Sequence, residues 1–541
     1  MYGLDSARLF LDLSSSLLLI YQLLTLKVAP VGGTAPRVIG GPGIQSRLLE
    51  TSGAPASQVG VMLAYEELKG SRGREMWFRA PRYEARRLFP HLPPRVRVRS
   101  SLHKLHNISL GGIAIVCSQG ADDVPEVDEV VPLTLQQSGY SIFESNARVA
   151  RRENTVFGSK IAFSFVNGFV EFDKLLSRNV QAQIAMQSAL LSGEANQLVP
   201  KEYRVFCADL LKMLGSYRHL LDENMALAKA FERDFDFEGA YQACEARLIQ
   251  HWRSLWRTGN DLVREFMGDR ESLEAAKNFT EVVVTPEMRL GAIWDRSYAK
   301  PLGYPGDFEV MNQVYDWKRE GANVYRMLMH RVGLEVAECI KTRMEVVRSA
   351  IADVVREKGN TRAARILSLG SGPAREVETF LAHNGMHGRR AEFTLIDQEQ
   401  AALNYALEKT YPHVLSAAGQ ARMQCLNMSF TDILRGTGAL GSLPPQDLIY
   451  SVGLIDYLVD RRANSLVHRL YETLAPGGLL IIGNMNETNL SNLWPMEFIT
   501  DWSLFYRSDA QMLAWTDGLA GKAWTETERT DRVRMLFVRK P

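Results

Sequence analysis

Short apolar runs alternate with helix-like runs from residue 365 to the C-terminus, and this alternation constrains the fold more than any other feature of the chain. The apolar runs read ARILSLG, AEFTLID, RMQCLNMS, QDLIYSVG, GLLIIGNM and RMLFVRK. Between them lie stretches such as EQAALNYALEKTY and ANSLVHRLYETLAP, whose apolar residues recur at helical spacing. This alternation is typical of βαβ units that build a mostly parallel sheet. We therefore expect an α/β domain over residues 361–541.

The first expected strand stops at two glycines. ILSLGSGPARE passes from an apolar run into Gly370-Ser371-Gly372 and restarts as a charged, helix-forming run. Glycine allows a sharp turn and lets a ligand lie against the backbone, as in dinucleotide- and nucleoside-binding corners. The next strand ends in Asp397, which is placed to reach the ribose hydroxyls of such a ligand. A tight turn without a ligand, and an Asp397 that only caps a helix, are the alternatives.

Further polar residues follow the other expected strands. The third strand ends at Asn427 and Met428, where a polar group beside an apolar one suits the edge and the face of an adenine. Ser451 and Tyr457 follow the fourth strand. Ligands of open α/β sheets bind at the carboxyl ends of strands, so these residues are candidates for one site. Asn427 is equally interpretable as a loop cap.

LSLGSGPA, LID and LAPGGLLIIG, in this order and spacing, resemble the class I S-adenosylmethionine-dependent methyltransferases. The resemblance implies a Rossmann-like domain with S-adenosylmethionine as methyl donor. It implies a cofactor site made of Gly370, Ser371, Gly372, Asp397, Asn427, Met428 and Ser451. Ser368 stands where an acidic residue is common in the family, and Ala374 replaces the third glycine. A dehydrogenase, the competing interpretation, would need that glycine to bind a phosphate at the helix start.

An irregular stretch, WDRSYAKPLGYPGDFEVMNQVYDW (294–317), interrupts otherwise helical sequence. Prolines and glycines in such a position favour a functional loop. In methyltransferases the segment before the first strand commonly closes over the donor. We therefore expect a lid in which Tyr304 covers the sulfonium or the adenine and Asp307 holds the ammonium group of the donor. Tyr304 and Tyr457 are the candidate catalytic residues, and a structural helix–helix connection is the alternative.

This stretch and PMEFITDWSLFYR together resemble bacterial methyltransferases of the kind that synthesise 3-hydroxy fatty acid methyl ester signals. The resemblance implies O-methylation of the carboxyl of a hydroxyacyl, fatty acid-like small molecule. A carboxylate acceptor needs no general base. The sequence after the fifth strand is accordingly rich in amides and aromatic residues and has no evident base. A methyltransferase that acts on a protein or on an aromatic acceptor is the alternative.

Two other regions precede the α/β region. Residues 71–175 contain VRVRS, GGIAIVCS, EVVPLTLQ and KIAFSFV with turn residues between them, a pattern that predicts a small β-barrel. Residues 176–360 contain long runs with apolar residues at helical spacing and predict a helical domain that includes the lid at 294–317. The expected fold is multidomain, with a barrel, a helical middle domain and a C-terminal α/β domain.

The barrel sequence contains NISLGG after a basic run. With an Arg-x-x-x-Arg pair upstream, it resembles the PilZ domain, which binds cyclic di-GMP. The resemblance implies that arginines grip phosphates and stack on guanines while polar side chains bind base edges. The implied effector site consists of Arg82, Arg86, Asn107, Ser109 and Gly112. A second frame places His91 where an arginine is expected, and the site would then be degenerate. A non-catalytic cyclic di-GMP receptor is an alternative for the whole chain.

Charge and cysteine content narrow the partners and the compartment. The net charge of +1 over 541 residues excludes a globally basic nucleic-acid binder. No two of the five cysteines have metal-ligand or redox spacing, so we expect no metal site and reduced thiols in the cytoplasm. The apolar run at 9–29 contains Asp12, Gln22 and Lys27, so we expect no stable membrane insertion. We interpret residues 1–70 as a disordered or wrongly assigned start.

Overall fold

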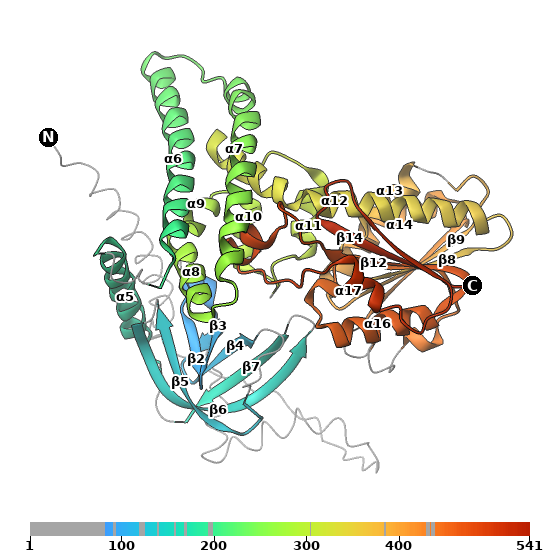
Figure 1. Ribbon diagram of the computed structural model, residues 1–541, viewed down its shortest axis with the longest axis horizontal. Helices are drawn as coiled ribbons and strands as arrows, with labels where there is room; N and C mark the ends of the chain where they lie inside the picture. Colours follow the sequence, from blue (N-terminus) through green and yellow to red (C-terminus); the bar gives the residue numbers. More distant parts are fainter. Residues whose placement is uncertain are drawn as a thin grey trace, which may run out of the picture. The chain divides into compact units, whose positions relative to one another are not determined.

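The computed structural model describes most of the chain beyond residue 81 (Figure 1). The described residues are 82–89, 93–117, 125–137, 140–155, 158–166, 170–192, 198–302, 304–383, 386–428, 433 and 439–541. They belong to one compact unit, Ala80–Pro541. The expectations for residues 1–70 and for the apolar run at 9–29 lie outside the described residues. Among the described residues, no helix is long and apolar enough to cross a bilayer.

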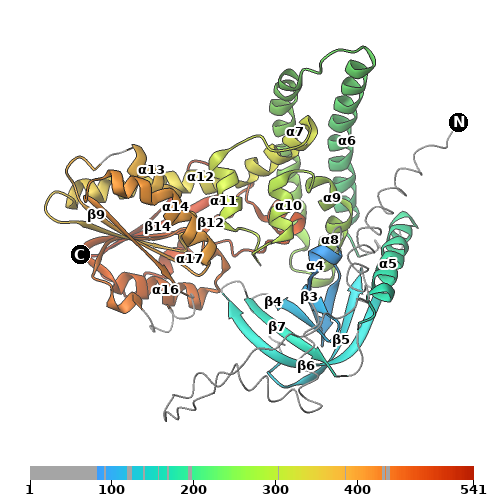
Figure 2. The same ribbon diagram turned by 180° about the vertical axis from the view of Figure 1, so that it is seen from behind.

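The first described region is an antiparallel barrel, which confirms the prediction of a small barrel (Figure 2). Its strands are β1 (Tyr83–Glu84), β2 (Arg95–Val98), β3 (Ser101–Ser109), β4 (Gly112–Cys117), β5 (Val130–Gln137), β6 (Tyr140–Thr155) and β7 (Gly158–Phe165). They pair in the order β1-β3-β2-β5-β6-β7-β4, and an additional β3–β4 pairing closes the barrel. Alternation fills the interior, since Val131, Leu133 and Leu135 of β5 are buried while Val130 is exposed. The short helix α4 (Ala85–Leu88) lies between β1 and β2, and α5 (Phe172–Ser192) follows β7.

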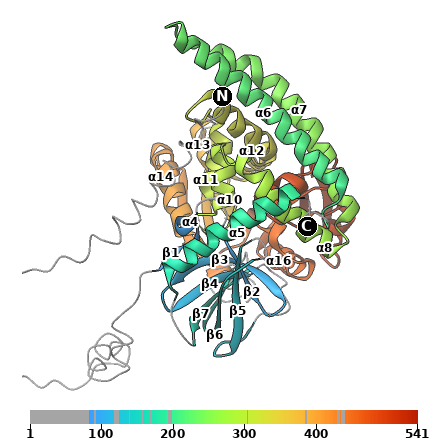
Figure 3. The same cartoon turned by 90° about the vertical axis from the view of Figure 1, so that its left-hand side faces the viewer.

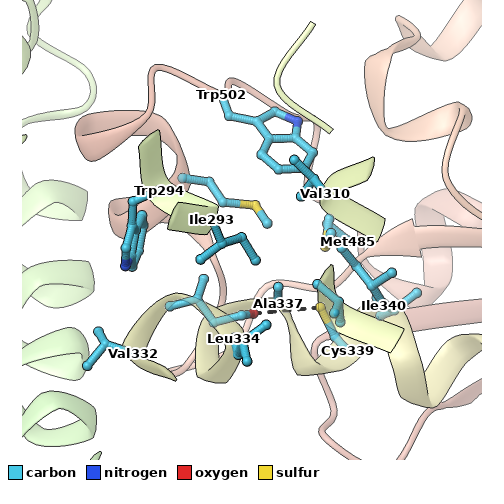
Figure 4. Packing of buried hydrophobic residues seen from close by; sticks show 14 of the residues in the cluster. Ile293, Trp294, Val310, Val332, Leu334, Ala337, Cys339, Ile340, Met485 and Trp502 are labelled. Atoms are coloured by element: carbon cyan, nitrogen blue, oxygen red, sulfur yellow. Dashed lines mark hydrogen bonds between the residues drawn. The ribbon is translucent and has the colours of Figure 1, made fainter. Parts of the chain in front are cut away.

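The next region is helical, as the sequence predicts. Its helices are α6 (Lys201–Ala230), α7 (Phe237–Phe266), α8 (Arg270–Val283), α9 (Thr285–Met288), α10 (Ala292–Ala299), α11 (Phe308–Asp316) and α12 (Val324–Lys358). The long helices α6 and α7 lie side by side (Figure 3). The core of this region continues into the C-terminal part of the chain. Val332, Ile340 and other residues of α12 pack with Trp294 and with Met485 and Trp502 (Figure 4).

The C-terminal region is a seven-stranded sheet with helices on both faces (Figure 1). Its strands are β8 (Ala364–Leu369), β9 (Ala391–Asp397), β10 (Ala421–Asn427), β11 (Gln446–Ser451), β12 (Leu474–Met485), β13 (Lys522–Thr527) and β14 (Val533–Arg539). They lie in the order β10-β9-β8-β11-β12-β14-β13. The pairs from β10 through to β12 are parallel, and β14 is antiparallel to both of its neighbours.

Two cores sandwich this sheet, because successive side chains of a strand point to opposite faces. Ile366 of β8 packs in one core with α12, α13 (Arg375–His383) and α14 (Gln400–Ser416). Leu367 packs in the other core with α16 (Asp460–Glu472) and α17 (Asp509–Ala514). The six predicted strands of this region are confirmed, and β13 is one that the sequence pattern missed. The domain boundaries given above stay predictions.

Candidate functional site

The strand order creates a crevice at the carboxyl ends of β8 and β11. From β8 the chain proceeds to β9 and β10 on one side and then returns to place β11 on the other. Connections leave these two strands in opposite directions, which makes this point of the sheet the usual ligand position in open α/β folds. The Gly370–Gly372 turn follows β8 at this position, and the loop 452–454 follows β11.

The glycine turn has a backbone that favours glycine. The φ angles of Gly370 and Gly372 are +68° and +52°, in the left-handed region. The main-chain N–H groups of Gly370 and Ser371 donate to the carbonyl of Ile396 at 2.8 and 3.1 Å, which fixes the turn against the end of β9. Ala374 also has a positive φ, +50°, although it carries a side chain. The backbone at this position is therefore of the kind that favours glycine, although the residue is alanine.

Asp397 joins this turn to the next one. Its Oδ2 accepts a hydrogen bond from the Gly372 N–H at 2.8 Å, and its Oδ1 accepts one from the Glu399 N–H at 2.9 Å. Burial raises the pKa of this carboxyl, against the effect of those two N–H donors. Asp397 therefore braces two loops and also faces the crevice, since it lines the cavity described next.

A small cavity of about 60 Å³ lies over the glycine turn. Its lining consists of Tyr304, Gly306, Phe308, Met311, Leu369, Gly370, Gly372, Ile396, Asp397, Gln398, Met428, Gly453, Leu454 and Tyr457. The irregular stretch covers the turn closely, because a Cβ built on Gly372 would lie 3.0 Å from the Met311 Sδ. A volume of about 60 Å³ is well below the usual range for small-molecule sites, and the segment from Tyr304 to Met311 forms one wall of this cavity.

The remaining predicted cofactor residues lie at different depths. Met428 lines the small cavity. Ser371 and Ser451 are buried, and each has a buried Oγ without a hydrogen-bond partner among the described residues. Asn427 is exposed, and its Nδ2 donates to the carbonyls of Asp397 and Gln398 at 3.1 and 3.0 Å. That is the geometry of a loop cap, and the adenine role of Asn427 stays a prediction.

Asp307 does not reach the small cavity. It is fully buried and caps the N-terminus of α11 by accepting from the N–H groups of Glu309 and Val310 at 3.1 and 3.0 Å. Its carboxylate also pairs with Arg296 at 2.8 Å. These partners give Asp307 a structural position, and the predicted contact with the donor's ammonium group stays a prediction.

The two candidate catalytic tyrosines come together. Tyr304 and Tyr457 line the small cavity from the irregular stretch and from the short 3-10 helix η4 (Ile455–Tyr457). The Tyr457 hydroxyl accepts a hydrogen bond from the Trp502 Nε1 at 2.9 Å. Burial raises the pKa of both phenols, so both keep their protons at neutral pH and neither acts as a phenolate base.

A large cavity of about 540 Å³ meets the small one at these tyrosines, since Tyr304 and Tyr457 line both. Three stretches of chain build its walls. The barrel supplies residues from Glu84 to Val116, the helical region supplies residues from Met267 to Pro305, and the C-terminal region supplies Tyr457, Glu497 and residues 501–505. The sequence reasoning did not foresee this cavity, because residues so far apart in the chain leave no local pattern.

A group of charged residues on the wall of the large cavity, here called the cationic cluster, was also missed. It consists of Arg95, Lys104, Glu281, Lys300 and Asp501. Lys104 pairs with the carboxylate of Asp501, and the Lys300 Nζ donates to the carbonyl of Asp501 at 2.6 Å and lies 3.4 Å from its carboxylate. Arg95 pairs with Glu281 at 3.0 Å.

Arg343 of α12 is a second residue that sequence reasoning missed. It is buried, and its Nε has no hydrogen-bond partner among the described residues. A Cβ built on Gly453 would lie 2.8 Å from the Arg343 Nη2, so the guanidinium lies against the loop that lines the small cavity. Asp456 follows on that loop, and burial raises its pKa to about 6 against the opposing charge of Arg343. An arginine in the middle of a long helix gives no sequence signal of this contact.

The predicted effector residues lie on the barrel. Asn107 and Ser109 end β3 and Gly112 begins β4. Ser109 donates to the carbonyl of Gly112 at 3.2 Å, and a Cβ on Gly112 would meet the carbonyl of Phe163 at 2.4 Å, so both have structural reasons to be there. Arg82 is exposed. The side chain of Arg86 and the whole of His91 lie outside the described residues, and cyclic di-GMP binding stays a prediction.

The chain matches no protein-family model and no curated protein. Among solved structures, it is similar to a "possible exported protein" from Bordetella parapertussis, with 17% identity over 56% of this chain and 97% of that one, at a TM-score of 0.34. It is also similar to magnesium protoporphyrin IX methyltransferase from Synechocystis PCC 6803 with bound S-adenosylmethionine (13% identity, 46% and 95% of the chains, TM-score 0.30). Human N-acetylserotonin methyltransferase is a third (14%, 49% and 70%, TM-score 0.29). Likenesses at these scores do not say what this chain binds.

Proposed function

We propose that this chain is an S-adenosylmethionine-dependent methyltransferase whose residues 361–541 form a Rossmann-like domain, and that it O-methylates the carboxyl of a hydroxyacyl small molecule. One observation carries the proposal: at the switch point of the sheet, the Asp397 carboxylate binds the Gly372 N–H beside a cavity over the glycine turn. This is the position of a nucleoside's ribose in open α/β sheets. No phosphate site is needed, which agrees with Ala374 in place of a third glycine.

The residues around the small cavity fit the parts of the donor. Asp397 would hold the ribose hydroxyls, since each carboxylate oxygen can accept more than one hydrogen bond. Ile396 and Met428 offer apolar contacts for the adenine. Arg343 is buried beside Gly453, and its Nε has no hydrogen-bond partner in the described part of the chain, so it would hold the carboxylate at the donor's amino acid end. The glycines leave room for the ligand against the backbone.

For this reaction the chain mainly has to align the donor with the acceptor and exclude water. When bound, the donor supplies a methyl group on a positively charged sulfur. Tyr304 and Tyr457 stand where the two cavities meet and stay protonated, so they orient the acceptor oxygen and exclude water without removing a proton. This arrangement suits an acceptor that is already an anion, because a carboxylate requires no base.

Calorimetric titration of the full chain with S-adenosylmethionine tests the proposal. We expect binding by the unaltered chain and a loss of about 10- to 100-fold in Asp397→Asn, because a charged hydrogen-bond acceptor contributes about 1.5–3 kcal/mol. Glu392→Gln, a carboxylate on the same strand that pairs with Arg365, is the matched control. Absence of donor binding by the unaltered chain would leave a non-catalytic protein.

Mass spectrometry identifies the acceptor. Bacterial lipid extracts incubated with the chain and a labelled donor should yield a methyl ester of a hydroxy acid. Label in a protein or in an aromatic compound would instead support the alternative acceptor classes.

Cyclic di-GMP, which we propose as a regulator bound at the β3–β4 end of the barrel, is tested by adding it to the same methyl-transfer assay with Arg82→Ala as the control variant.

A further inference from the structure

The barrel and the C-terminal region share the wall of one cavity. Strand β3 contributes Leu102 to His106 to the large cavity, and the segment from Asp501 to Phe505 lies across from it. Lys104 joins the two by its ion pair with Asp501. The barrel therefore supplies part of the wall of the cavity that lies beside the candidate catalytic tyrosines.

The charges of the cationic cluster do not balance. Three cationic side chains, Arg95, Lys104 and Lys300, face two carboxylates, Glu281 and Asp501. Arg95 forms its ion pair with Glu281, and both lysines form their ion pairs with Asp501. Three further ion pairs include residues of this wall: Lys277–Glu497, Arg289–Asp295 and Arg87–Glu84. Each is neutral and leaves the imbalance unchanged.

An unbalanced cation in a partly buried place is unfavourable without an anion. Burial, and after it the charge of Lys300, lowers the pKa of Lys104, and burial lowers the pKa of Lys300 to about 8. A single negative charge bound between the two ammonium groups would complete the pairing. The cluster is thus built for one anionic group.

The rest of the large cavity is lined by polar side chains, among them His103, His106 and Glu497, and by a set of apolar ones. Phe89, Leu105 and Val116 line it from the barrel, and Met267, Leu504 and Phe505 line it from the other two regions. A cavity of about 540 Å³ is within the usual range for small-molecule sites. An anionic group at the cluster with an apolar body along these side chains matches both kinds of lining.

We propose that Lys104 and Lys300 bind the carboxylate head of an acid whose apolar tail lies in the large cavity, so that the barrel forms part of the acceptor site. This inference rests on the proposed methyltransferase function. In the transfer, a carboxylate oxygen bonds to the methyl carbon, the carbon–sulfur bond breaks, and its electron pair stays on the sulfur. No proton moves. The ester is neutral and loses its attraction to the lysines, which favours its release.

Binding without turnover tests the assignment. The full chain is titrated with decanoate in the absence of donor, in the unaltered form and as Lys104→Met and Lys300→Met. We expect each variant to bind decanoate about tenfold more weakly, since each loses one charged hydrogen bond. Lys174→Met, an exposed lysine of α5, should bind decanoate normally. Decanamide, which has no charge, should bind all forms alike.

Separate measurements distinguish this inference from the proposed function. Decanoate affinity that is equal in the unaltered chain and both methionine variants overturns the inference, even if methyl transfer is observed. Lysine-dependent decanoate binding supports it, even if S-adenosylmethionine fails to bind and the proposed function falls. Should a methionine variant fail to fold, Lys104→Arg and Lys300→Arg keep the charge, and we expect them to retain decanoate binding within about threefold.

Discussion

The two cavities that meet at Tyr304 and Tyr457 are built in opposite ways. The small cavity is lined by loops that follow neighbouring strands of one sheet, and its polar wall is Asp397 with the glycine turn. The large cavity is lined by side chains from the barrel, the helices and the segment 497–505, and its polar wall is the cationic cluster. A site built by strand ends is recognisable from short motifs, whereas a site assembled by packing of distant regions is not.

The largest effect that separates the two cavities is expected from Gly372→Val. A valine at a φ of +52° is strained, and its Cβ would lie 3.0 Å from the Met311 Sδ, where a ligand must also fit. We expect the affinity for S-adenosylmethionine to fall by at least about 100-fold, equivalent to roughly 2.7 kcal/mol. Decanoate binding, which uses the large cavity, should stay near that of the unaltered chain. Both affinities are measurable by calorimetry.

Gly419→Val is the matched control. Gly419 also has a positive φ, +80°, but nothing lies within 4 Å of its Cβ position, and it precedes β10 at the opposite end of that strand from Asn427. It should lose a comparable amount of stability in thermal melts and keep its donor affinity. Equal loss of donor affinity in both variants would mean that the glycine turn acts through stability alone.

The contrast between the cavities explains what the sequence predicts and what it misses. The strands β8, β9 and β11 are buried on both faces, so they read as continuous apolar runs, and the residues that follow them are adjacent in the chain. Strand β13 pairs only with β14 at the edge of the sheet, and its sequence KAWTET has no apolar pattern to detect. Asp307 was predicted for its position in a turn, and the structure shows that it caps α11 and pairs with Arg296, which no local pattern indicates.

A medium effect on the rate of methyl transfer is expected from Trp502→Phe, a change at the junction where the two cavities meet. Trp502 lines the large cavity and donates its Nε1 hydrogen bond to the Tyr457 hydroxyl at 2.9 Å. Phenylalanine keeps the apolar contact and removes the donor, so Tyr457 is held less firmly between the two cavities. We expect the rate of methyl transfer at saturation to fall about tenfold. The affinities for S-adenosylmethionine and for decanoate should each change by less than about threefold.

Single-turnover kinetics and the two titrations check this result. Trp524→Phe provides a tryptophan control on the edge strand β13, far from Tyr457 along the sheet. A large loss of donor affinity in Trp502→Phe would contradict the view that this tryptophan serves the junction. It would place the tryptophan among the residues that shape the small cavity.

Residues that belong to no sequence motif, and that come together only by long-range packing, could not be predicted. Lys104 and Lys300 read as ordinary basic residues in the sequence, and only the fold brings both to Asp501. Arg343 reads as one charged residue of an amphipathic helix until α12 packs beside Gly453. In each case the informative fact is a contact between distant parts of the chain, for which composition and spacing carry no signal.

The pH dependence of binding gives a smaller effect that also separates the cavities. Lys300 has a pKa of about 8, lowered by burial, and it faces Lys104, Arg95, Glu281, Lys277 and Asp501. Below pH 8 its ammonium is present, and above pH 8 it is progressively lost, while a carboxylic acid ligand stays ionised throughout. We expect decanoate affinity to fall about three- to tenfold between pH 7 and pH 9.

Lys300→Arg should weaken this dependence, because arginine stays charged over the whole range. The remaining dependence would belong to Lys104, whose pKa is also lowered by burial and by the charge of Lys300. The lining of the small cavity, within the described residues, contains no lysine or histidine, so donor affinity should not follow the same curve. Titrations with decanoate and with S-adenosylmethionine at several pH values measure both affinities. An equal fall in the Lys300→Arg variant would assign the transition to another group of the cluster.

The smallest expected effect concerns the edge of the small cavity. Asn427→Ala removes two hydrogen bonds from Nδ2 to the carbonyls of Asp397 and Gln398. Because the side chain is exposed, water replaces the lost donor, and we expect a destabilisation of about 1 kcal/mol in thermal melts. Donor affinity should change by less than about threefold if the residue only caps the loop. A tenfold loss of affinity with unchanged stability would instead mean that Asn427 contacts the adenine, and that the donor site extends beyond the lining of the small cavity.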